Sequence, residues 1–104
     1  MDYKHNARFI EHGTRYSMSN NFHENLKYKI DKHVFYSYEL TKFFPNEERF
    51  GLSDQLRRST MSVMLNYVEG FARKKEKVKL NFYEISYGSL QETKYIIYFA
   101  YKQV

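Results

Sequence analysis

Residues that break helices or form tight turns are scarce in this chain, with only four Gly and one Pro among 104 residues. All-β sandwiches and barrels need many turns, and glycine and proline are the strongest turn signals. Long helices with few joints are the alternative. We therefore predict an all-α protein, and 104 residues are enough for one domain with a modest core.

The composition excludes several classes of protein. Aromatic residues make up 19% of the chain, which argues against disorder. The absence of Cys excludes disulfides, thiolate metal sites and cysteine nucleophiles. Residues 1–10 lack the apolar core of a secretory signal, and no apolar run approaches the roughly 20 residues that span a bilayer. We expect a cytoplasmic protein with no membrane association.

The apolar spacing predicts three long helices, at about residues 22–43, 47–70 and 76–102, in a helical bundle domain of residues 22–104. Residues 1–21 show no sustained periodicity and are predicted to form a mobile N-terminal arm. Pro45 disfavours helical backbone at Phe44 and should end the first helix there. Gly70 is suited to end the second, because glycine adopts left-handed backbone without a Cβ penalty.

The predicted third helix is apolar over more than one face. One stripe contains Phe82, Ile85, Ser86, Ser89, Thr93, Ile96, Ile97 and Ala100. Gly88 lies beside it, and a close approach between two helices would explain a glycine there. A second stripe contains Tyr83, Tyr87, Lys94, Tyr98 and Tyr101. Three helices cannot bury all of this surface, so we predict a homo-oligomer.

Most of the positive charge lies in one segment. The formal net charge is +5, and residues 71–80 contribute +4 of it through Arg73, Lys74, Lys75, Lys77 and Lys79 against Glu76. Concentrated positive charge attracts nucleic-acid phosphates through counterion release. We therefore predict that these five residues bind nucleic acid, with Arg57 assisting. The alternative is a solvated joint whose lysines serve solubility.

A second polar set belongs to the predicted second and third helices. Arg57 and Arg58 are adjacent, so they point about 100° apart. If Arg58 turns inward it needs a carboxylate, since an unpaired buried charge is costly. We predict a structural polar network of Arg58, Asn66, Glu69 and Glu92, with a ligand site as the alternative.

Other candidate sites are weak. The tyrosine stripe favours a protein interface over a surface on which bases stack. The four His show no metal-binding spacing, and no phosphate loop, nucleophile elbow or Glu-x-x-His motif occurs. We expect no metal, no cofactor and no catalysis.

Several short motifs between Leu40 and Glu92 are similar to those of one helical family. The matching residues are Leu40-Thr41, Phe44-Pro45, Glu48, Leu52, Gln55, Leu56-Arg57-Arg58, Ser62, Asn66, Glu69-Gly70, Arg73, Phe82, Gly88-Ser89-Leu90 and Glu92. On these residues the chain resembles the four-helix bundle proteins encoded by intervening sequences of bacterial ribosomal RNA genes. That family is related to the accessory variability determinant of diversity-generating retroelements.

The resemblance implies an antiparallel up-down helical bundle that assembles as a ring-like homopentamer. It also implies association with RNA or DNA, and a reverse transcriptase as partner, as in the retroelement relatives. The chain departs from the family pattern at Ser59, Tyr67, Val68 and Thr93. Val104 precedes a complete fourth helix, so we expect three long helices with the family's fourth truncated or missing.

Three functions remain open at this point. The first is a homo-oligomeric scaffold that binds nucleic-acid backbone without reading sequence. The second is a protein–protein adaptor that docks a partner such as a reverse transcriptase. The third is a purely structural protein.

Overall fold

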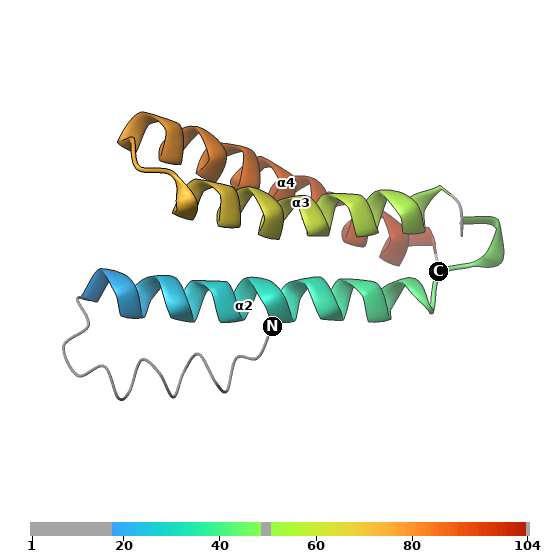
Figure 1. Ribbon diagram of the computed structural model, residues 1–104. Helices are drawn as coiled ribbons and strands as arrows, with labels where there is room; N and C mark the ends of the chain where they lie inside the picture. The colour runs from blue at the N-terminus through green and yellow to red at the C-terminus, as the bar shows by residue number, and fades with distance from the viewer. Residues whose placement is uncertain (1–17, 49–50, 104) are drawn as a thin grey trace.

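Three long helices make up the computed structural model, which describes residues 18–48 and 51–103 (Figure 1). They are α2 (Met18–Thr41), α3 (Leu52–Ala72) and α4 (Glu76–Gln103), and a short 3₁₀ turn, η1 (Asn46–Glu48), follows α2. No strand occurs within these described ranges. The predicted all-α class is therefore confirmed.

The helix boundaries differ from the predicted ones at two places. Helix α2 begins at Met18, inside the predicted arm, and residues 1–17 of that arm lie outside the described residues. Helix α2 ends at Thr41 and a turn leads to Pro45, as expected for a residue that cannot donate to a helix. Residues 46–48 form η1 instead of the first turn of α3, which begins only after Gly51.

The two helical glycines have roles opposite to those predicted. Gly70 does not end α3, which continues to Ala72 and stops where Arg73 adopts extended backbone. A Cβ atom at Gly70 would lie 2.7 Å from the ring of Tyr83 on α4, so close helix packing excludes any side chain there. A Cβ at Gly88 would meet nothing within 4 Å. The predicted close approach is therefore at Gly70, and the prediction for Gly88 within this chain is wrong.

Consecutive helices run in opposite directions, and α4 crosses behind α3 in this view (Figure 1). Helix α3 packs more extensively against α4 than against α2. The principal extents are 50 × 31 × 18 Å, so the molecule is a thin slab. Since one helix with its side chains is roughly 10 Å across, this depth holds only about two layers.

The core is small and unusually polar. Among the described residues the buried apolar set is Val34, Leu56, Val63, Tyr67, Ile96 and Ala100. An equal number of buried residues carry hydroxyls: Ser37, Ser53, Ser59, Thr60, Ser86 and Thr93. A core with so few large apolar side chains leaves many others at the surface.

Small hydroxyl side chains join α3 to α4. The Ser86 hydroxyl donates to the carbonyl of Val63 at 2.6 Å, and that of Thr93 donates to Ser59 Oγ at 2.8 Å. Ser62 Oγ and Ser89 Oγ lie 2.7 Å apart. These short side chains let the two helices approach closely while satisfying buried polar groups.

Candidate nucleic-acid interface and assembly surfaces

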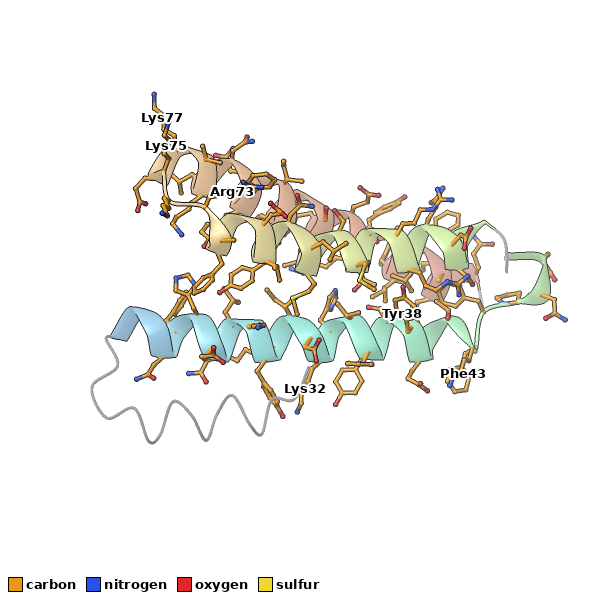
Figure 2. The ribbon with its side chains drawn as sticks, viewed as in Figure 1. Lys32, Tyr38, Phe43, Arg73, Lys75 and Lys77 are labelled. Carbon is orange, nitrogen blue, oxygen red and sulfur yellow. The ribbon has the colours of Figure 1, made fainter. Side chains whose placement is uncertain are left out.

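The basic joint, which we define as Arg73, Lys74, Lys75, Lys77 and Lys79, connects α3 to the first turns of α4. Lys75 and Lys77 project away from the helices at one end of the molecule (Figure 2). Lys74, Lys75 and Lys77 are exposed, and within residues 18–48 and 51–103 they form no hydrogen bond or ion pair. Three free ammonium groups therefore lie together on one protruding turn.

The other two members of the basic joint bind the protein itself. Arg73 forms an ion pair with Glu69 and lies over the ring of Phe82, 5.4 Å from its centroid. The Lys79 ammonium donates to the carbonyl of Phe71 at 3.0 Å. It thus satisfies an orphan carbonyl at the C-terminus of α3, where a cation is favourable. Arg73 and Lys79 position the turn that carries the three free lysines.

Arg57 does not join this group. It lies near the opposite end of α3, about 24 Å along the helix from Arg73 at roughly 1.5 Å per residue. Its guanidinium donates to Asp54 at 3.0 Å and to Thr41 Oγ1 at 3.3 Å, which ties α3 to the end of α2. This geometry gives Arg57 a structural contact separate from the basic joint.

The predicted polar network is not closed within the described part of the chain. Arg58 points outward, with 81% of its side chain exposed, and its nearest carboxylate oxygen is 3.8 Å away on Asp54. Asn66 donates to the carbonyl of Ser62 at 2.9 Å, and Glu69 pairs with Arg73. Glu92 is exposed and forms no ion pair with any described residue. The four residues contact different partners, so the network remains a prediction.

An aromatic cluster lies beneath the basic joint, where α2, α3 and α4 meet. His23 Nδ1 is 2.6 Å from the hydroxyl of Tyr67, and the Tyr67 ring stacks on Tyr83 with centroids 5.6 Å apart. Phe71 packs edge-on against His23. Burial raises the pKa of the Tyr67 hydroxyl well above its usual range, and Tyr83 adds to the rise. The sequence interpretation missed this cluster, although Tyr67 and Phe71 share a helix face by their spacing.

An apolar groove of about 470 Å³ opens between α2 and α4, with α3 as its floor. Its lining includes Leu26, Ile30 and His33 from α2, and Tyr87 and Leu90 from α4. His33 Nε2 is buried in this groove and has no hydrogen-bond partner among the described residues. Partial burial lowers the pKa of His33. The groove is thus an apolar surface on which none of the described residues packs.

A second hollow of about 470 Å³ lies further along the same two helices. It is lined by residues from the end of α2 and the end of α4: Leu40, Phe43, Phe44, Ile97, Ala100, Tyr101 and Lys102. Phe43 and Tyr101 are 80% and 76% exposed. Ile96, by contrast, is buried against α3.

The described residues contain no helix long and apolar enough to cross a membrane. In the same ranges, His, Asp and Glu side chains nowhere gather in a group of three able to hold a metal ion.

Comparison with known proteins gives one family. The model of the 23S rRNA-intervening sequence protein family matches residues 27–103, which include residues 27–41 of α2 and all of α3 and α4. No curated protein and no solved structure matches the sequence. The match confirms the resemblance seen in the motifs between Leu40 and Glu92. The chain belongs to the 23S rRNA-intervening sequence protein family.

Proposed function

We propose that this protein is a homo-oligomeric helical scaffold that binds the backbone of RNA or DNA without catalysis. The observation that carries the proposal is the set of three free ammonium groups on Lys74, Lys75 and Lys77 at one end of the molecule. Ammonium groups that form no internal ion pairs are available to phosphates, and phosphate contacts release counterions. The family name associates these proteins with a ribosomal RNA gene insertion, which supports RNA as the first ligand to test.

Repetition of the joint would make a weak site effective. Three lysines on one subunit bind phosphates only modestly, and lysine reads no base by itself. In a homo-oligomer the same turn recurs in every subunit, so a long nucleic acid engages several joints at once. The proposed binding is therefore led by charge and shape.

The exposed apolar surface supports self-association. Large apolar side chains that are at least 38% exposed occur on all three helices. Phe22 and Tyr87 line one hollow between α2 and α4, and Phe43 and Tyr101 line the other. Contiguous apolar surface on a soluble chain marks an interaction site. We propose that copies of the chain cover part of it in an antiparallel helical bundle, as the ring-like pentamer implied by the resemblance, in the cytoplasm.

The RNA proposal is tested by removing the three free lysines together. We expect Lys74/Lys75/Lys77→Ala to weaken binding of a labelled RNA duplex about tenfold or more at low salt. The slope of log Kd against log salt should fall by about three, roughly one for each lost phosphate contact. Fluorescence anisotropy over a salt series measures both quantities.

The matched control removes three exposed lysines away from the basic joint, Lys32, Lys42 and Lys102, and so changes the net charge equally. This control should retain most of the affinity. Equal losses in the two triple variants would show a diffuse charge effect and contradict a site at the basic joint. A Kd that stays constant between about 50 and about 200 mM salt would contradict phosphate binding altogether.

A protein–protein adaptor is the second candidate function. Tyr87, Tyr98 and Tyr101 on α4 are 56%, 55% and 76% exposed, and tyrosine is enriched in protein interfaces. A partner such as a reverse transcriptase, which the resemblance implies, would dock on this surface. A pull-down that survives nuclease treatment but is lost in Tyr98→Ala/Tyr101→Ala would favour this function over RNA binding.

A further inference from the structure

The outer side of α3 carries a short stripe of three residues with different chemistry. Arg58, Ser62 and Leu65 follow one another at helical spacings of four and three, so they share one face. The Arg58 side chain is 81% exposed, and Leu65 is 56% exposed. The hydrogen-bonding contact between Ser62 and Ser89 marks where this face meets α4. The stripe thus presents an exposed cation and an exposed apolar residue, with the half-buried Ser62 between them.

Helix α4 carries a matching stripe of Ile85, Gly88 and Glu92, spaced by three and four. Ile85 is 45% exposed, and Glu92 forms no ion pair with a described residue. Gly88 lies in the middle of a long helix, where glycine lowers stability relative to alanine. A Cβ at Gly88 would meet none of the described residues within 4 Å, so no contact among them explains this loss. A glycine at such a position permits close approach of another backbone.

The two stripes are complementary when α3 of one copy is laid antiparallel on α4 of another. Read from its N-terminal end, the α3 stripe has a cationic, a small and an apolar residue. Read from its C-terminal end, the α4 stripe has an anionic, a small and an apolar residue. The spacing is four then three residues along α3, and it is also four then three along α4 when α4 is read backwards. All three positions therefore face each other in one antiparallel register. The matched pairs are Arg58 with Glu92, Ser62 with Gly88, and Leu65 with Ile85.

We propose that self-association occurs through this contact, with the α3 stripe of one copy on the α4 stripe of a second copy. The inference rests on the proposed homo-oligomer and deepens it by naming the surface and the occupant. Charge complementarity selects the second copy, since the chain itself supplies both charges: Arg58 is exposed with only a 3.8 Å ion pair to Asp54, and Glu92 has no ion pair among the described residues. The small pair at the centre allows the helices to approach, and the apolar pair loses its exposed surface.

Reversing one charge at a time tests the pairing. Arg58→Glu places two carboxylates in contact and Glu92→Arg places two guanidinium groups in contact. We expect each variant to raise the dissociation constant of self-association about tenfold or more. An equimolar mixture of the two variants should associate again, because each then meets its opposite charge. Rescue by mixing cannot arise from a contact within one chain.

Gly88→Gln tests the close approach independently. Glutamine is a better helix former than glycine and meets open space in the single chain, so helicity and thermal stability of the monomer should not fall. Its side chain would separate the two helices at the centre of the contact. We expect the same loss of association as for the charge reversals.

The matched controls are Lys32→Glu and Glu39→Arg on α2, which change the net charge identically at exposed positions outside both stripes. They should assemble like the parent chain. Sedimentation velocity over a concentration series measures all variants and the mixture. If the parent assembles and the stripe variants assemble equally well, this contact is wrong and the proposed homo-oligomer stands. If the parent is monomeric at every concentration, the homo-oligomer and this contact are both wrong.

Discussion

The contacts that α3 makes with its two neighbours differ in kind. Toward α4, serine and threonine hydroxyls pair along the seam, and Gly70 admits the ring of Tyr83. Toward α2, the described side-chain hydrogen bonds lie near the two ends of the contact, at His23–Tyr67 and Arg57–Thr41. Small side chains bring helices together and satisfy their own polar atoms, whereas large side chains hold helices apart and leave grooves.

This difference predicts where the molecule is complete and where it needs a partner. Between α3 and α4 the buried hydroxyls of Ser59, Ser86 and Thr93 are hydrogen-bonded. Ser53 Oγ and Thr60 Oγ1 on α3 are buried without a partner among the described residues. The α2 side leaves His33 Nε2 without a partner in an apolar groove. Substitutions between α3 and α4 should therefore change the free energy of unfolding. Substitutions around the groove between α2 and α4 should change the pH dependence of stability and the self-association of the chain.

The largest expected effect is at Gly70. Gly70→Ala would place a methyl group within 3 Å of the Tyr83 ring and force that ring from its stack on Tyr67. We expect a loss of about 1–3 kcal/mol in the free energy of unfolding, as for other overpacked cores. Urea denaturation monitored by circular dichroism measures it.

A double-mutant cycle sharpens this prediction. In a Tyr83→Ala background the contact with the ring is absent and only the 3.1 Å approach to Phe82 Cβ remains. Gly70→Ala should therefore cost much less there, because alanine is also the better helix former. An equal loss in both backgrounds would contradict a close contact between Gly70 and Tyr83.

The next effect concerns the hydroxyl seam. Thr93 is completely buried, and its hydroxyl lies 2.8 Å from both Ser59 Oγ and the carbonyl of Ser89. Thr93→Val keeps the shape but removes these hydrogen bonds, and it leaves Ser59 with one fewer partner. We expect a loss of about 1–2 kcal/mol in the free energy of unfolding. Thr93→Ser, which keeps the hydroxyl, separates the lost hydrogen bonds from the lost methyl group. A Val variant as stable as the parent would show that the seam is held by packing alone.

The smallest effect is a pH dependence from the α2 side. Burial places the pKa of His33 in the folded chain below its usual value of about 6.5. Between the folded and unfolded pKa values the unfolded chain binds more protons, so stability falls as the pH falls. The contribution of His33 is therefore complete above about pH 6.5 and is lost in mild acid. His33→Leu should make the melting temperature depend less on pH between about pH 5 and about pH 7. If the melting temperature of this variant changes with pH as steeply as that of the parent, other titratable groups cause the pH dependence.

The sequence predicted the helices better than their contacts. The apolar spacing predicted three long helices, and Leu56, Val63 and Tyr67, which follow that spacing on α3, are buried. The same periodicity could not distinguish Gly70, which packs against another helix, from Gly88, which faces open space, because the neighbour of a helical residue is set by tertiary packing. The helix end before Pro45 was predicted from local chemistry, whereas α3 begins at Leu52, later than the predicted residue 47, because residues 46–48 form η1.

The candidate site shows the same division. Charge counting found the basic joint, since lysines close in sequence remain close in space on one turn. It could not show that Lys79 donates to α3 carbonyls or that Arg73 lies on Phe82. It also grouped Arg57 with residues that lie at the other end of α3. Contacts between helices decide which charges are free, and these contacts are not encoded by local spacing.

The central claim is that three helices leave many large apolar side chains exposed, so that copies must associate. The most direct test is the solution mass of the chain, measured by light scattering across a concentration series. The subunit mass is 12.7 kDa. We predict a particle whose mass is a multiple of this value and which persists on dilution into the micromolar range. A stable, monodisperse particle of 12.7 kDa at all concentrations would contradict the account.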